Sequence, residues 1–113
     1  MSDSDVKYRE AEQLKSEGKR EEAISKLEEI LRDDAGHVMS HLALAVLYGQ
    51  VGQHEDAVRH GQEACQLDPS DAFNFTALSV TYQRAWQGTQ NMQYIRLAED
   101  AMARAHMLQG HHG

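Results

Sequence analysis

The chain has 113 residues, of which 41% are hydrophobic and 26% charged, with one cysteine and a formal net charge of −7 at pH 7. That length allows one domain with its own core and is too short for two. A single cysteine cannot close an internal disulfide, and the polar first residues lack the basic and apolar segments of a signal peptide, so we expect a reducing, cytoplasmic setting. No run approaches the roughly 20 apolar residues that cross a bilayer, and lysine and arginine form no stripe that could follow phosphates. We therefore expect neither membrane insertion nor a nucleic-acid partner.

Charge is concentrated in the first third of the chain. Residues 1–36 contain eleven acidic and seven basic side chains, whereas residues 37–113 contain seven acidic and four basic ones. The first third therefore has the composition of a solvated pair of helices, and the rest is expected to bury or share more of its surface.

Apolar residues recur at intervals of three and four in this first third, which predicts two amphipathic helices over about residues 4–16 and 20–33. The residues that carry the pattern are Ala11, Leu14, Ala23, Ile24, Leu27, Ile30 and Leu31. Between the two helices, residues 16–19 contain Gly18 and no apolar side chain, as is typical of a turn.

Four more helices are predicted, over about residues 38–50, 54–67, 70–86 and 91–109. The whole chain is therefore expected to be all-α. The fifth helix is expected to start at the segment 68–71, where Asp68 can cap the helix and Pro69 suits the first helical position. Asp71 would then lie near the positive end of the helix dipole.

The chain repeats itself at a fixed offset along the sequence. The pairs that share this offset include Gly18 with Gly52, Glu21 with Glu55, Ala23 with Ala57, Ala11 with Ala45, and Leu14 with Tyr48. The two residues of each pair are separated by 34 residues, and we call this spacing the repeat offset. A fixed period of this length is typical of proteins built from stacked helix pairs.

These residues make the sequence similar to the tetratricopeptide repeat (TPR) family, whose repeating unit is a helix-turn-helix with small residues at its eighth, twentieth and twenty-seventh positions. The second repeat fits this signature best, through Leu44, Ala45, Tyr48, Ala57, Ala64 and Pro69. The resemblance covers about residues 4–105 and implies a single domain, an α-α superhelix (solenoid) of three repeats at about residues 4–37, 38–71 and 72–105. Residues 110–113 are then expected to form a flexible tail.

The third repeat departs from the family spacing. Tyr82 and Ala98 are separated by sixteen residues where the family has nine, so seven residues are inserted at about residues 85–91. Two interpretations are open. The insertion is a binding loop that presents Trp86, or it is an extra helical turn whose Trp86 packs back onto the last helix and covers the end of the solenoid.

Gly61 stands where the resemblance implies a large side chain between helices. A glycine inside a helix costs about 1 kcal/mol relative to alanine, so we expect another residue to fill the space. We predict that Phe75, early in the next helix, fills it.

The resemblance implies a non-catalytic protein-protein interaction module, an adaptor or assembly scaffold, because first helices of successive repeats line a concave groove in this family. The groove positions that we predict for contact with a partner are Met39, Leu42, Val46, Gln50, Phe73, Thr76, Val80, Gln83 and Arg84. The clamp that some members use for a peptide's C-terminal carboxylate is absent, since Tyr8 and Glu12 occupy its first positions. The apolar middle favours an apolar peptide or helix of another protein. Alternatively, the chain's own ends or a second copy cover these residues.

The last helix offers a second candidate surface. It carries two apolar stripes, of which we assign Ile95, Ala98, Met102 and Ala105 to its own repeat. The other stripe and the insertion give a second predicted surface, which consists of Trp86, Met92, Tyr94, Leu97, Ala101 and Leu108. With no capping helix to cover it, this surface predicts an alternative function, self-association as a structural homodimer.

A His-based metal binder is the third and least favoured alternative function, and no specific metal or catalytic site is predicted. His37 and His41 stand four residues apart, but no cysteine or carboxylate accompanies them at a diagnostic spacing, and His54 and His60 are expected to face solvent. The histidines at 111–112 are expected to bind metal only adventitiously. No phosphate-binding loop or nucleophile motif is present, so we expect no cofactor and no enzymatic activity.

Overall fold

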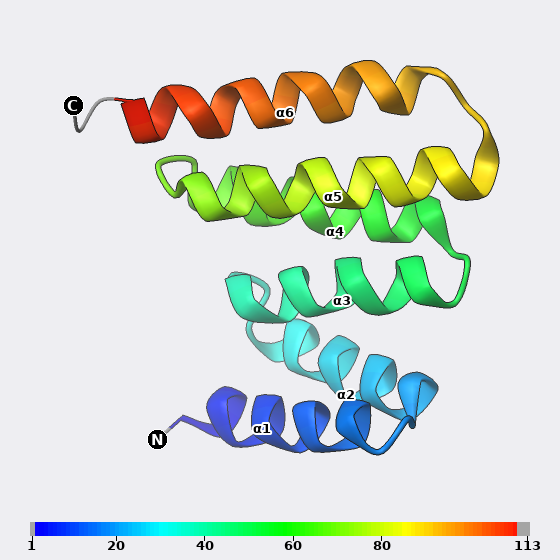
Figure 1. Cartoon of the computed structure of the whole chain (residues 1–113). Helices are drawn as coiled ribbons and strands as arrows, with labels where there is room; N and C mark the ends of the chain where they lie inside the picture. Colours follow the sequence, from blue (N-terminus) through cyan, green and yellow to red (C-terminus); the bar gives the residue numbers. More distant parts are fainter. Residues whose placement is uncertain (1, 111–113) are drawn as a thin grey trace.

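The structure, a computed structural model, describes residues 2–110, which form six α-helices. Their bounds are α1 Asp3–Ser16, α2 Arg20–Asp33, α3 Val38–Gln50, α4 His54–Leu67, α5 Ala72–Thr89 and α6 Gln93–Gly110. Successive helices run in opposite directions and pack against their neighbours along the chain (Figure 1). The all-α prediction is confirmed, and there is no strand within residues 2–110.

The first four helices begin and end within one residue of the predicted bounds. Both the first and the last residues of α2 and α4 are separated by the repeat offset that relates Gly18 to Gly52. Three residues connect the two helices of each of the first two pairs, and the middle one is Gly18 or Gly52, with φ of 80° or 84°. Glycine adopts this left-handed conformation without steric cost, which explains why a glycine recurs at this offset.

The seven inserted residues lengthen the last two helices and form no long loop. Shifted by the repeat offset, the end of α3 falls within α5, which continues for five more residues. Shifted by the repeat offset plus the seven inserted residues, the start of α4 falls within α6, which begins two residues earlier. Residues 90–92 connect them, and here the left-handed residue is Gln90, with φ of 63°. The insertion is therefore helical and does not form a long loop.

The fifth helix begins at Ala72, two residues later than predicted. Its N-cap is Asp71, whose carboxylate accepts a hydrogen bond from the backbone N–H of Phe73 at 2.9 Å. Asp68, the predicted cap, instead ends α4, and its N–H donates to the carbonyl of Ala64 at 3.1 Å. The prediction was wrong because two aspartates with capping chemistry lie three residues apart, and only the end of α4 decides between them.

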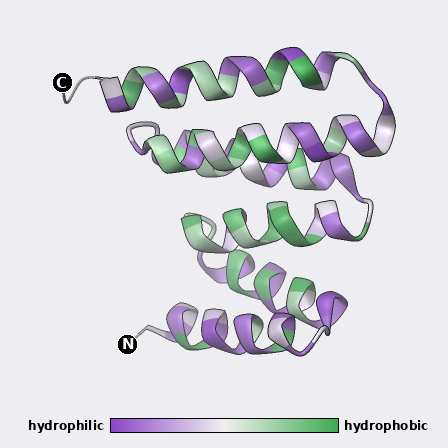
Figure 2. Cartoon of the chain, in the orientation of Figure 1, coloured by the Kyte–Doolittle hydropathy of each residue, from purple (hydrophilic) through white to green (hydrophobic). Residues whose placement is uncertain are grey.

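Two clusters of buried apolar side chains form the core. The first joins α1, α2 and α3 and contains Ala11, Ala23, Leu27, Ile30, Leu44 and Leu47. The second joins α4, α5 and α6 and contains Val58, Cys65, Leu78, Tyr82, Ala85, Ala98 and Ala101. α3 is the most hydrophobic helix and packs against α2, α4 and α5 (Figure 2). Burial of these apolar side chains is the main source of stability.

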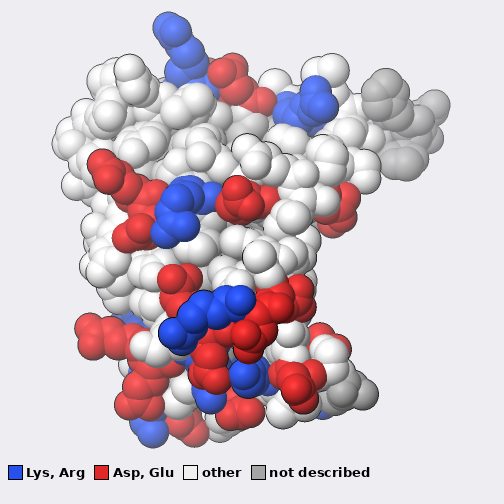
Figure 3. Space-filling view, turned by 180° about the vertical axis from the view of Figure 1, so that it is seen from behind, with Lys and Arg blue, Asp and Glu red and all other residues white. Residues whose placement is uncertain are grey.

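Charged side chains gather on the N-terminal half of the face that Figure 3 shows. Between α1 and α2, Lys7 lies 3.1 Å from Glu29, and Lys26 lies 3.4 Å from Glu10. These pairs are exposed to solvent, which screens the attraction between the charges. The charge therefore keeps the first helix pair solvated and adds little to its stability.

Leu78, rather than the predicted Phe75, fills the space beside Gly61. A Cβ atom built on Gly61 would lie 3.0 Å from Cδ1 of Leu78 and 3.9 Å from Cβ of Ala45. The ring of Phe75 instead lies beneath the guanidinium of Arg104 in α6, whose central carbon is 5.8 Å from the ring centroid. The prediction was wrong because the helical rotation of α5 turns Leu78 toward α4 and Phe75 toward α6.

We predict that Gly61→Leu destabilises the protein by roughly 1–3 kcal/mol, because the new side chain would overlap Leu78. Leu78→Ala alone should cost about 2–5 kcal/mol, since it leaves a cavity. The double variant should be more stable than the two single effects together predict, as measured by urea denaturation followed by circular dichroism. Strictly additive effects would contradict the contact between these two positions.

Candidate functional site

The predicted concave groove is drawn from α3 and α5, which pack against each other. Three of its apolar side chains are exposed, Phe73 at 62%, Met39 at 51% and Val80 at 38%. Leu42 and Val46 are partly buried. Large apolar side chains that stay in water on two adjacent helices are available for contact with another molecule.

Most polar members of the predicted groove already bond within the chain. Gln50 accepts a hydrogen bond from Nε of Arg20 at 3.1 Å, and the hydroxyl of Thr76 donates to a carbonyl within α5 at 3.2 Å. Gln83 also lines a pocket between α5 and α6, and Arg84 is exposed. Of these residues, Arg84 therefore keeps the most freedom to contact a partner.

The second predicted surface is divided between the core and the solvent. Ala101 is 6% exposed, and Tyr94 stacks on Tyr82 with ring centroids 6.0 Å apart, so both face the core. Met92 and Leu97 are exposed. The predicted division of α6 is wrong for Tyr94 and Ala101, which pack against the chain, whereas Ala98 and Ala105 are buried and Leu97 is exposed, as predicted.

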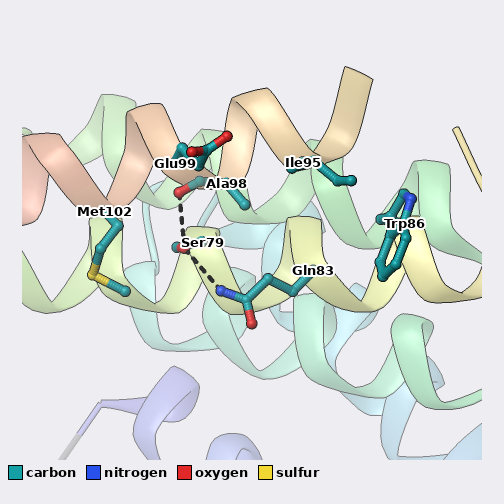
Figure 4. Close-up of a pocket in the computed structure, with 7 residues that line it drawn as sticks. All are labelled: Ser79, Gln83, Trp86, Ile95, Ala98, Glu99 and Met102. Atoms are coloured by element: carbon teal, nitrogen blue, oxygen red, sulfur yellow. Dashed lines mark hydrogen bonds between the residues drawn. The ribbon is translucent and has the colours of Figure 1, made fainter. Parts of the chain in front are cut away.

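Three residues of the predicted inner stripe, Ile95, Ala98 and Met102, line an open pocket between α5 and α6. We call this pocket the α5/α6 cleft, and its volume is about 400 Å³. Its lining, drawn in Figure 4, consists of Ser79, Gln83, Trp86, Ile95, Ala98, Glu99 and Met102. The sequence contains no motif for this cleft, although the repeat offset relates its residues to earlier helix pairs.

The polar atoms on the floor of the cleft bond to one another. The hydroxyl of Ser79 donates to the carbonyl of Ala98 at 2.9 Å and accepts from Nε2 of Gln83 at 3.4 Å (Figure 4). The cleft consequently presents mainly hydrocarbon, with the ring of Trp86 at one end. The indole N–H of Trp86 is buried without an acceptor in the described part of the chain, which costs about 1–3 kcal/mol.

A second cluster, which the sequence did not reveal, is the buried pair of His41 and His60. They are 6% and 3% exposed, so the prediction that His60 faces solvent is wrong. Their Nδ1 atoms lie 2.9 Å apart, and Nε2 of His41 lies 2.9 Å from the carbonyl oxygen of Ala35. Because a carbonyl oxygen only accepts, we assign the proton of His41 to Nε2, and its Nδ1 accepts from the Nδ1–H of His60.

Nε2 of neutral His60 is left without a proton. It lies 3.4 Å from Oε1 of Glu28 and makes no hydrogen bond with residues 2–110. Burial, with smaller contributions from Arg59 and His41, lowers the pKa of His60 to about 4, while Asp56 acts in the opposite direction. The ring is therefore neutral at pH 7.

The other histidines of the described chain have structural positions. His37 does not share a helical face with His41, because it is the N-cap of α3 and its Nδ1 accepts from the backbone N–H of Ser40 at 3.2 Å. His54 is partly buried against α5, where a Cβ atom on Gly88 would overlap its ring, so the prediction that it faces solvent is wrong. No three His, Cys, Asp or Glu side chains of residues 2–110 are grouped to hold a metal ion.

The predicted tail at residues 110–113 is described only at its first residue. Gly110 ends α6, and the histidines at 111–112 lie outside the described residues. None of the helices between residues 2 and 110 combines the length and the apolar character that crossing a membrane requires.

The single cysteine lies in the core. Cys65 is 6% exposed, and burial raises the pKa of its thiol to about 11. The thiol is therefore protonated at pH 7, which makes it a poor nucleophile.

Comparison with known proteins does not assign a family. No protein-family model matches the chain, and a search of curated proteins returns no match.

We predict that His60 makes the protein less stable in acid. An ordinary histidine has a pKa of 6.5, and folding lowers that of His60 to about 4. Its contribution to stability is therefore complete above pH 6.5 and is lost as the pH falls toward 4, by up to about 3 kcal/mol. Urea denaturation at several pH values between neutral and acid measures this loss.

His60→Gln, which cannot titrate, should lose less stability in acid than the wild type. The matched control is His106→Gln, since His106 is exposed, and its pH dependence should follow that of the wild type. Equal pH dependence of the wild type and His60→Gln would show that the buried ring does not carry the effect.

Proposed function

We propose that the chain is a non-catalytic protein-interaction module, an adaptor or scaffold built as a short superhelix of three tetratricopeptide-like repeats. The observation that carries the proposal is the exposed apolar surface on α3 and α5, where Phe73 and Met39 are more than half exposed. Full burial of a side chain of this kind against a partner gains roughly 1.5–3 kcal/mol.

The helix spacing supports the repeat architecture. The starts of α3 and α5 are separated by the same repeat offset as the starts of α2 and α4. Ala11 and Ala23 of the first pair and Ala45 and Ala57 of the second are all buried, which allows the two helices of each pair to approach closely. Equivalent surfaces of α3 and α5 would then lie along one groove.

The class of partner follows from the side chains on this surface. Phe73 supplies a rigid aromatic anchor, and Met39 supplies a flexible chain that adapts to different apolar partners. Arg84 at the edge can bind a carboxylate or carbonyl group of the ligand. The surface suits an apolar helix or an extended apolar segment of another protein.

The N-terminal end of the surface disfavours a free C-terminal carboxylate. Glu12 carries a negative charge there, and burial together with Glu12 raises the pKa of Tyr8 to about 12, so the phenol stays neutral. Glu12 would repel a terminal carboxylate at this end, even though Lys15 lines the same pocket. We therefore propose an internal segment of the partner as the ligand.

We predict that Phe73→Asp strongly reduces capture of the partner, because a carboxylate would be buried in an apolar contact. The measurement is affinity capture from native lysate with quantitative mass spectrometry, with circular dichroism to show that the variant remains helical. The captured amount of a partner held by this surface should fall by roughly tenfold or more, which corresponds to a loss of about 1.4 kcal/mol of binding free energy.

Leu67→Asp is the matched control, since Leu67 is 42% exposed at the end of α4, outside the predicted groove. It should capture the same proteins as the wild type. If Phe73→Asp and Leu67→Asp retain the same proteins in the same amounts, the surface on α3 and α5 is not the binding site.

A further inference from the structure

The three helix pairs form three equivalent grooves. In the first, the small residues Ala11 and Ala23 form the floor, and at the repeat offset Ala45 and Ala57 take the same positions in the second. In the third, the equivalent residues are Ser79 and, after the seven-residue insertion, Ala98, both of which line the α5/α6 cleft.

The first two grooves are each filled by the next helix of the chain. Leu44 of α3 packs in one buried cluster with the floor of the first groove and with Leu27. Leu78 of α5, which is related to Leu44 by the repeat offset, lies against Gly61 in the second groove. Each of these two grooves thus receives a leucine from the next helix along the chain.

The third groove receives no helix from the described chain. The pocket beside Leu27 in the first groove has a volume of about 30 Å³, whereas the α5/α6 cleft has about 400 Å³. Met102 stands in the third groove at the position that Leu27 has in the first and Gly61 in the second. Trp86, on the lengthened α5, lines the same groove. The cleft is an apolar groove of the kind that this fold fills with a helix.

We propose that the α5/α6 cleft binds an amphipathic α-helix of a different protein. The helix that fills the second groove defines the pattern that fits. Leu78 and Thr81 of α5 lie beside Gly61 of α4, Tyr82 accepts a hydrogen bond from Gln62 of α4, and Ala85 shares a buried cluster with Val58, which gives spacings of three, four and seven. This proposal does not depend on the concave surface of α3 and α5, since the exposed apolar residues of that surface, Met39, Phe73 and Val80, do not line the cleft, although Gln83 belongs to both.

Charge defines the partner further. Glu99 lines the cleft where the second groove has the buried apolar residue Val58. A bound helix would cover this carboxylate, and burying an unpaired charge is costly. The partner helix should therefore carry a lysine or arginine beside its apolar residues, which also suits a chain with a net charge of −7.

A second copy of this chain is a poor occupant. In a head-to-tail stack, α1 of the next copy would enter the cleft in the way that α5 enters the second groove. Glu10 and Glu17, the latter just after the end of α1, would then take the places of Leu78 and Ala85. A symmetric pairing of two clefts would bring two Glu99 carboxylates into one apolar interface. Both arrangements bury like charges together, which is unfavourable.

Trp86 makes the proposal measurable, because it is the only tryptophan and lines the cleft. The probe is a synthetic peptide with the sequence of residues 71–89 in which Trp86→Phe removes its own fluorescence. We expect it to shift the emission of the protein's Trp86 to shorter wavelength in a saturable way. A peptide of residues 2–17, which forms the more polar α1, should not do so.

Two variants locate the binding. Met102→Glu should lower the affinity for the peptide by roughly tenfold or more, since it places a second carboxylate in the cleft. Met107→Glu is the control on the same helix, because Met107 is 60% exposed and does not line the cleft, and it should bind like the wild type. Circular dichroism checks that both remain helical.

Three outcomes would overturn the proposal. The first is no saturable response to the 71–89 peptide. The second is equal binding by Met102→Glu and the wild type, which would mean that the peptide replaces α5 or binds elsewhere. The third is a wild-type mass in analytical ultracentrifugation that rises with concentration and is lost in Met102→Glu, because the occupant would then be a second copy.

Discussion

The close approach of paired helices at small residues is the constraint on which the rest of the structure depends. Ala11 and Ala23 in the first pair, and Ala45 and Ala57 in the second, are all at most 4% exposed. Larger side chains at these positions would hold the two helices apart. The shallow groove above each contact is then filled by a leucine from the following helix, so each pair is stabilised mainly by its neighbour along the chain.

This dependence on the next neighbour gives the two ends of the chain different surfaces. No helix pair precedes the first within residues 2–110, and α1 presents ion-paired side chains such as Lys7 and Glu10 to solvent. The last pair keeps an apolar cleft with Met102 in its wall. The charged end resists stacking with another copy, whereas the apolar end and the exposed Phe73 leave two surfaces on which a partner can gain energy by burial.

The buried histidines show how the second pair is tied to the first. His41 of α3 bonds both to His60 of α4 and to the carbonyl of Ala35 in the connection that follows α2. One nitrogen of His60 remains without a hydrogen bond to the described residues. Desolvation of that atom therefore offsets part of the stability that the hydrogen bonds of His41 contribute. A buried polar contact of this kind favours one arrangement of the helices over others that would leave more polar atoms unpaired.

Local patterns were enough to predict the helices, because apolar periodicity and the turns at Gly18 and Gly52 depend on residues close together in the sequence. The rotation of each helix about its own axis was not predictable in the same way, since it depends on what packs against the helix. For that reason the residue beside Gly61, the positions of Tyr94 and Ala101 on α6 and the burial of His60 were predicted wrongly. The sequence by itself determined the number, length and order of the helices, and only the tertiary structure decided which side chains meet and which cleft stays open, because packing acts between residues that are distant along the chain.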